Sequence, residues 1–247
     1  MATVLTCLIV VAVILVMVSR SWQQDDPPPP HPTELGFPPA PVQQLPQADE
    51  EVDPGEPGPV VELPEDEWVT RTAERTGIPE RALAAYAGAS LRVGETHPQC
   101  RLGWNTLAGI GHVESAHGSY GGAEVAEDGT VSPEIIGVAL DGSEGVMEIP
   151  DTDDGELDGD DEWDRAVGPM QFIPTTWRQY ARDGSGDGQE DVHQYDDAAL
   201  TAAVYLCENG EDLGSDRGWN DAVAAYNRSV EYANDVAGFA EDYAEGE

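Results

Sequence analysis

The stretch LAGIGHVESAHG, residues 107–118, places a carboxylate where a globular protein usually places an apolar side chain. Leu107, Ile110 and Glu114 are three and four residues apart, so on an α-helix these side chains share one face. A carboxylate at the end of an apolar stripe has its charged form disfavoured, and its pKa should rise. Such a group suits general acid chemistry near neutral pH. A helix-end Glu in a purely structural network fits the same spacing.

Apolar side chains at helical spacing continue on both sides of this stretch, and they predict a mainly helical domain. Gly109 and Gly111 would each cost about 1 kcal/mol inside a helix, so another helix or a ligand should pack closely against them. The apolar run 135–140 predicts a strand or hairpin, which would be a small β element. The expected helices span residues 65–76, 79–93, 104–116, 175–180, 197–208, 219–226 and 230–243.

The first 64 residues differ in composition from the rest of the chain. An apolar run at residues 4–18 predicts a signal peptide or membrane anchor over residues 1–22, and both alternatives imply export to the cell envelope, anchored or secreted. Of the 19 prolines, 13 lie between Pro27 and Pro64, so residues 23–64 are expected to be a disordered, proline-rich linker. Residues 65–247 are then one folded domain. Export also makes a disulfide between Cys100 and Cys207 the expected state of these cysteines.

The chain is strongly acidic, with 49 Asp and Glu against 11 basic residues and a formal net charge of −38. Such a surface repels nucleic acid, which excludes nucleic acid as a partner. All 11 basic residues are Arg, and this composition suggests a surface adapted to high salt. We expect a monomer. Sixteen of the acidic residues lie in an insertion at residues 121–165, which we expect to be a long surface excursion.

Two segments after the insertion carry polar groups in informative positions. The apolar stretch AVGPMQFIP, residues 166–174, predicts a buried irregular turn in which Gln171 either satisfies backbone groups or holds a polar ligand. Residues 183–189, DGSGDGQ, place oxygen-bearing side chains at alternate positions before a glycine, as in an EF-hand calcium loop. Position twelve is Gln194, so closure would need Asp196 or Asp197, and an ordinary acidic surface loop fits equally well. Residues 154–159 match the start of a calcium loop less well, because position twelve is Arg165. We therefore expect an ordinary surface loop there.

The order of these motifs resembles a known family. A helix with VESAHG (113–118), then AVGPMQFIPTTW (166–177), then DGSGDG (183–188) with a later Asp, then AAYN (224–227) is similar to the lytic murein transglycosylases of the membrane-bound type B group. The resemblance covers residues 65–236 and implies a goose-lysozyme-like, mainly α fold of the lysozyme-like α+β kind. The acidic insertion has no counterpart in the better-known members.

The resemblance also implies roles for individual residues. Glu114 matches the catalytic acid and base, and Ser115 matches the neighbour that orients it. The implied substrate-binding residues are Met170, Gln171 and Phe172 in the cleft loop, with Gln171 facing the N-acetyl sugar, and the cleft-lining pair Tyr226 and Asn227. The implied ligands of a structural Ca²⁺ are Asp183, Ser185, Asp187, Gln189 and Asp197.

By the same resemblance, the protein would cleave the β-1,4 bond between MurNAc and GlcNAc in peptidoglycan glycan strands, leave 1,6-anhydro-MurNAc ends, and need no catalytic cofactor. Two alternatives stay open. A muramidase would use water and a second carboxylate, for which Asp164 and Glu124 are candidates. A wall-binding scaffold would hold the glycan without cutting it, and its Glu114 would be structural.

Overall fold

The computed structural model describes residues 36–49, 52–55, 57–143 and 145–246, which belong to one compact unit, Pro32–Glu247. The signal peptide or anchor predicted at residues 1–22 lies outside this part. Within it, no helix combines the length and the apolar character that crossing a membrane would require.

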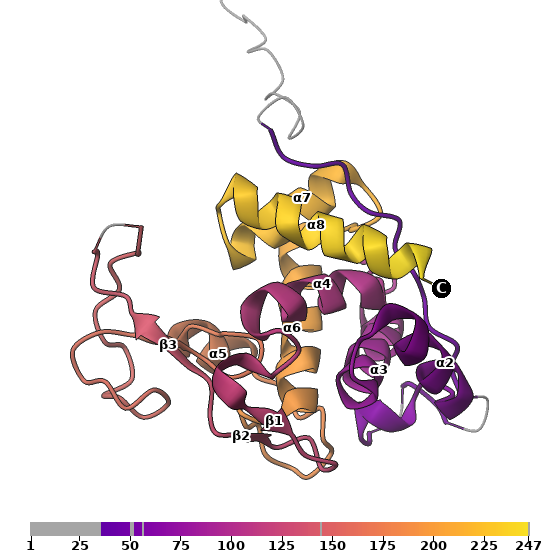
Figure 1. Ribbon diagram of the computed structural model, residues 1–247, viewed down its shortest axis with the longest axis horizontal. Helices are drawn as coiled ribbons and strands as arrows, with labels where there is room; N and C mark the ends of the chain where they lie inside the picture. Colours follow the sequence, from indigo (N-terminus) through magenta and orange to yellow (C-terminus); the bar gives the residue numbers. More distant parts are fainter. Residues whose placement is uncertain (1–35, 50–51, 56, 144, 247) are drawn as a thin grey trace, which may run out of the picture. The chain divides into compact units, whose positions relative to one another are not determined.

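Helices are the main regular structure of the described chain, as the sequence predicted (Figure 1). Each predicted helix is present, and the boundaries differ from the prediction by up to two or three residues. The α-helices are α2 (Asp66–Thr76), α3 (Glu80–Thr96), α4 (Trp104–Ser115), α5 (Pro174–Tyr180), α6 (Tyr195–Gly210), α7 (Asp216–Tyr226) and α8 (Val230–Glu245), and the 3-10 helices are η2 (Val60–Glu62) and η3 (Tyr120–Gly122).

Helix α4 lies at the centre of the helical body and is buried along its first eight residues. It packs most extensively on α8, and α3 packs on α4 and α6 (Figure 1). A Cβ added to Gly109 would lie 2.7 Å from the carbonyl oxygen of Val236, and one added to Gly111 would lie 1.8 Å from the Tyr86 hydroxyl. The close packing predicted at both glycines is therefore confirmed, and it places the end of α4 against its neighbours.

The disordered linker predicted for residues 23–64 is wrong over the part that the structure describes. Pro38, Pro41 and Pro46 are buried, and Val60 and Leu63 belong to the hydrophobic core. The described part of this proline-rich segment (residues 36–49, 52–55 and 57–64), the proline-rich arm, is also held by hydrogen bonds. The Asn105 amide donates to the carbonyl of Val42 and accepts from the backbone N–H of Gln44. Proline-rich composition removes backbone donors, but it does not prevent an extended chain from packing on a finished core.

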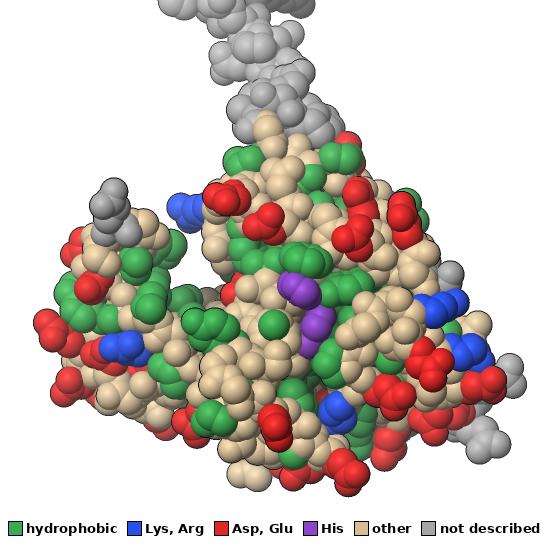
Figure 2. All heavy atoms as spheres, viewed as in Figure 1, with side chains coloured by type: hydrophobic (Ala, Val, Ile, Leu, Met, Phe, Trp, Pro, Cys, Tyr) green, Lys and Arg blue, Asp and Glu red, His purple; other side chains and the backbone are tan. Residues whose placement is uncertain are grey.

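The acidic insertion forms two small antiparallel strand pairs and a long loop over residues 140–164, which is the excursion. Strand β1 (Glu124–Val125) pairs with β2 (Val131–Ser132), and β3 (Ile136–Ala139) pairs with β4 (Arg165–Val167) through an irregular register. The predicted β element is therefore present. The excursion between β3 and β4 projects beside α5 (Figure 1), and a deep notch separates it from the helical body in the space-filling view (Figure 2).

Cys100, before α4, and Cys207, in the last turn of α6, form the predicted disulfide. The bond joins two segments 107 residues apart in the sequence. It therefore ties the entrance of α4 to α6, the helix that follows the acidic 183–194 loop.

Candidate active site

Glu114 lies on the last turn of α4 and is partly buried. Its environment raises the pKa of the carboxyl from 4.5 to about 7, mainly because burial disfavours the charged form. The Tyr232 hydroxyl donates a hydrogen bond of 2.5 Å to Oε1, which favours the charged form and offsets part of this rise. The carboxyl can thus both release and take up a proton near neutral pH.

Two tyrosines stand close to this carboxyl. Burial and the charge of Glu114 raise the pKa of both Tyr226 and Tyr232 well above 10, so both phenols stay protonated and act as hydrogen-bond donors. The Tyr226 hydroxyl donates to the carbonyl of Met170 at 2.9 Å. Tyr226 therefore joins the end of α7 to the 168–172 loop, while Tyr232 on α8 contacts the carboxyl itself.

Ser115, which the resemblance implied as the residue that orients Glu114, makes no hydrogen bond to Glu114 within the described chain. Its hydroxyl donates to the carbonyl of Pro169 at 2.6 Å and accepts from the backbone N–H of Gly118 at 2.8 Å. Ser115 therefore anchors the 168–172 loop to the end of α4. The group that holds the Glu114 carboxylate is the Tyr232 hydroxyl.

The 168–172 loop is a tight turn, as predicted, but most of its side chains point into the protein. Met170 is fully buried and Phe172 is 2% exposed, packing on Trp177 and Tyr226, so their positions contradict direct contact with a substrate. Gln171 adopts a left-handed backbone with φ of 48°, and its amide donates to the carbonyl of Gly168 at 2.9 Å. Of the two roles predicted for Gln171, the structure shows the first, since its side chain bonds to a backbone carbonyl of the same turn.

Asn227 is exposed after α7, and its side chain accepts a hydrogen bond from the backbone N–H of Ser229. The candidate second carboxylates are less favourably placed. Asp164 is fully buried in the excursion and accepts hydrogen bonds from Thr152, and Glu124 is an exposed residue of β1. Asp164 is therefore enclosed in the loop that holds it and is not exposed to solvent.

The predicted calcium loop is closed by Asp197, as the sequence allowed. One Asp197 oxygen accepts from the backbone N–H groups of Gly184 and Ser185, and the other accepts from Asp191. Both oxygens of Asp183 also accept backbone N–H groups. The oxygen-only donor set suits Ca²⁺, although Asp183, Asp187 and Asp197 do not form a tight carboxylate group within the described chain.

A surface pocket of about 670 Å³ lies between the β1–β2 region, the excursion and this loop. Most of its polar lining is acidic, including Asp128, Glu134 and Glu190, and Glu114 is not part of it. The pocket therefore does not locate the chemistry. The raised pKa and the neighbouring tyrosines mark the candidate site better than the size of this cavity.

A buried polar network that the sequence did not reveal lies beneath the end of α4. The Tyr86 hydroxyl bonds to Tyr195 and to His117 Nδ1, and Tyr243 bonds to both His117 and His112. Burial lowers the pKa of His117 to about 3, with a smaller contribution from His112, so His117 is neutral at physiological pH. The spacing of histidines and tyrosines in a sequence does not distinguish such a network from isolated side chains.

Part of this chain resembles proteins that are already known. Residues 151–220 match the model of the transglycosylase SLT domain family. No curated protein matches the chain. Two structures of the lytic transglycosylase Slt35 of Escherichia coli, one in complex with bulgecin A and one with calcium, align at 16% identity over 72% of this chain and 78% of Slt35, with TM-scores of 0.43 and 0.42.

The matched family segment begins within the excursion and ends within α7. It includes β4, the 168–172 loop, α5, the acidic 183–194 loop and α6, whereas Glu114 precedes it. These elements correspond to the second and third motifs on which the sequence resemblance rested, so residues 151–220 are similar to a transglycosylase SLT domain.

Proposed function

We propose that this protein is a lytic transglycosylase that cleaves the β-1,4 bond between MurNAc and GlcNAc in peptidoglycan and leaves 1,6-anhydro-MurNAc ends. The observation that carries the proposal is Glu114, a carboxyl with a pKa raised to about 7 that is held by the Tyr232 hydroxyl. The match to the SLT family supports peptidoglycan as the substrate.

A single carboxyl can perform both proton transfers of such a reaction. Protonated Glu114 donates its proton to the glycosidic oxygen as the bond from C1 to that oxygen breaks. The resulting carboxylate, stabilised by the Tyr232 hydroxyl, then takes the proton of the C6 hydroxyl as its oxygen bonds to C1. The sugar hydroxyl replaces the water that a hydrolase activates with its second carboxylate. Because the proton returns to Glu114, the enzyme ends in its starting state.

The structural features around the site support the same proposal. Ser115 and Tyr226 both bond to carbonyls of the 168–172 loop, so this loop is fixed beside Glu114. Gln171 and Asn227 are the predicted sugar contacts with exposed or partly exposed side chains. The disulfide fits an oxidising compartment, and export from the cytoplasm, with residues 1–22 as a signal peptide or membrane anchor, belongs to the proposal because the substrate lies outside the cell membrane. A structural Ca²⁺ in the loop that Asp183 opens and Asp197 closes is also part of it.

Mass spectrometry of purified peptidoglycan digested with this protein tests the proposal. We expect anhydro-muropeptides, and we expect Glu114→Gln to lower the rate of lysis by about 10³-fold or more, since it removes both proton transfers. Glu124→Gln, an exposed change of the same chemistry, should retain the wild-type rate. Hydrated reducing ends would instead identify a muramidase. Binding without any cleavage would identify a scaffold, and lysis by Glu114→Gln at the wild-type rate would refute the role of Glu114.

A further inference from the structure

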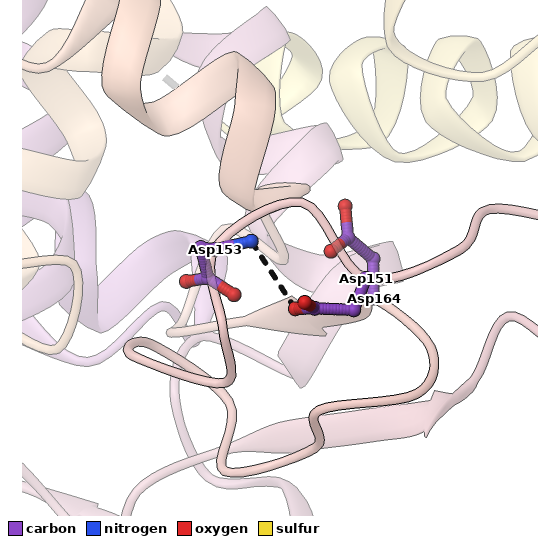
Figure 3. Close-up of side chains that lie close together, drawn as sticks. All are labelled: Asp151, Asp153 and Asp164. Carbon is purple, nitrogen blue, oxygen red and sulfur yellow. Dashed lines mark hydrogen bonds between the residues drawn. The ribbon is translucent and has the colours of Figure 1, made fainter.

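Three carboxylates gather inside the excursion between β3 and β4, in a different segment from the loop in which calcium was predicted. Asp151, Asp153 and Asp164 each offer an oxygen, and these three atoms lie within 4.8 Å of one another. Asp153 lies on one side of the loop, and Asp151 and Asp164 lie opposite it (Figure 3). The backbone N–H of Asp153 donates a hydrogen bond to the Asp151 carboxylate across this gap. Carboxylates repel one another at such separations unless a cation or a proton lies between them.

Asp153 supplies a second and independent observation. Its side chain is 4% exposed. Oδ2 accepts the backbone N–H of Leu157 at 2.9 Å, whereas Oδ1 is buried and has no hydrogen-bond partner within the described chain. A buried carboxylate oxygen without a partner is costly, and such a group is usually paired or bound to a metal.

The other two carboxylates are held in place by the loop itself. Asp151 accepts the backbone N–H groups of Asp153, Asp154 and Gly155, and Asp164 accepts the N–H and the hydroxyl of Thr152. These bonds prevent either side chain from turning away towards solvent. The three carboxylates therefore face one another because the backbone of the loop dictates it.

Neither Arg165 nor Arg178 forms a salt bridge with the three carboxylates within the described chain, although the charge of Arg178 favours the charged form of Asp153. Arg165 pairs with Asp160, and Arg178 donates through Nη1 to the carbonyl of Thr152 at 2.5 Å. The three carboxylates therefore have no ion-pair partner within the described chain, and a cation from outside the chain can take that place.

We propose that Asp151, Asp153 and Asp164 form a binding site for Ca²⁺. All three ligands are oxygens, which favours a hard cation over zinc or copper. Calcium takes carboxylate oxygens at about 2.3–2.6 Å, so two ligands on opposite sides of the ion lie about 5 Å apart. The 4.8 Å limit on the three oxygens fits this span.

The position of the site gives the cation a structural effect near the 168–172 loop. Asp164 immediately precedes β4, and β4 leads directly into that loop. The Arg178 bond to Thr152 joins the same turn to α5. A cation here fixes the excursion at the point where the chain enters the proposed active site, and this inference does not depend on the reaction that the site performs.

Calcium titration of the chelator-treated full chain by calorimetry tests the site. Asp153→Asn should bind one equivalent fewer than Asp154→Asn, an exposed neighbour with the same change of charge. At a calcium concentration of about 100 Kd, the site should raise the Tm of the Asp154→Asn control by about 5–10 °C relative to Asp153→Asn. Asp183→Asn, in the predicted calcium loop, should leave this equivalent in place. Equal binding by Asp153→Asn and Asp154→Asn would overturn the proposal, as would binding of Mg²⁺ without Ca²⁺.

Hydrogen exchange on the unaltered protein locates the cation even if Asp153→Asn folds poorly. We expect CaCl₂ to slow amide exchange in residues 151–165, because Asp151 and Asp153 accept the backbone N–H groups of Asp154, Gly155 and Leu157 in this turn. Slowed exchange confined to residues 183–197 would assign calcium to the other loop and refute the site.

Discussion

Two helix ends in this protein carry a carboxylate whose pKa is raised by burial, but the hydrogen bonds around the two groups differ. Glu114 ends α4 and has a pKa of about 7, and Asp197 lies in the first turn of α6 and has a pKa of about 6. Within the described chain, Glu114 accepts a single bond, from the Tyr232 side chain. Asp197 accepts three, all from backbone N–H groups.

The difference separates a carboxylate that can react from one that organises a loop. Backbone donors cannot move without unfolding the loop, and the start of a helix favours a negative charge, so Asp197 is fixed in a structural role. The end of a helix disfavours a negative charge, which adds to the effect of burial on Glu114. Because its donor is one side chain and its other oxygen is not engaged by the described residues, Glu114 can exchange a proton.

The largest effect that would test this comparison is the loss of stability in Asp197→Ala. The change leaves the N–H groups of Gly184, Ser185 and Asp191 without their acceptor, and we expect a loss of about 3–5 kcal/mol in the free energy of unfolding. Urea unfolding in the presence of a chelator measures this loss without any contribution from bound cations.

Asp187→Ala is the matched control, because Asp187 is exposed in the same loop and accepts one bond, from the N–H of Gln189. It should change stability by less than about 1 kcal/mol. If both variants lose the same stability, Asp197 does not organise the loop and the contrast with Glu114 fails.

A smaller effect of the opposite sign is expected for the stability of Glu114→Gln. The folded pKa of Glu114, about 7, lies above its ordinary value of 4.5, so the folded state holds a proton that the unfolded state releases between pH 4.5 and 7. Stability therefore falls as pH rises through this range. Glutamine removes the charge and still accepts from Tyr232, so the variant should be more stable than wild type by about 1–3 kcal/mol at pH 8 and equal to it at pH 4.

Urea unfolding at the two pH values measures this difference. Glu124→Gln should show no such dependence on pH, because Glu124 is exposed on β1. A Glu114→Gln variant that is equally stable or less stable than wild type at pH 8 would show that the carboxylate is not destabilised by its surroundings.

The sequence predicted the helical framework well, because apolar periodicity and the glycines of α4 report packing directly. It also predicted the disulfide and the raised pKa of Glu114, which follow from compartment and from burial. The prediction from sequence failed where it relied on amino-acid composition alone, because composition does not show whether a segment packs on the domain. The proline-rich arm was expected to be disordered, yet Pro38, Pro41 and Pro46 are buried against the domain.

Residue roles were harder to predict than elements. The partner of Glu114 is Tyr232, which lies 118 residues away and on another helix, so no local spacing could have identified it. Met170 and Phe172 were placed in the correct loop, but a motif does not state which side of a turn faces the core. In the excursion, the pattern at 154–159 was read as surface, whereas the carboxylates that gather are Asp151, Asp153 and Asp164.

The smallest effect concerns the bond that distinguishes Glu114 from Asp197. Tyr232→Phe removes the one donor that favours the carboxylate, so the pKa of Glu114 should rise further, by about 0.5–1 unit. Titration of the ¹³C-labelled Glu114 carboxyl by NMR measures this shift, and the alkaline limb of the lysis rate should move by the same amount. Tyr243→Phe, on the same helix, removes a hydroxyl that bonds to His112 and His117 instead and should leave the titration unchanged. An unaltered midpoint in Tyr232→Phe would mean that burial alone sets the proton affinity of Glu114, and that Tyr232 positions the carboxylate without tuning it.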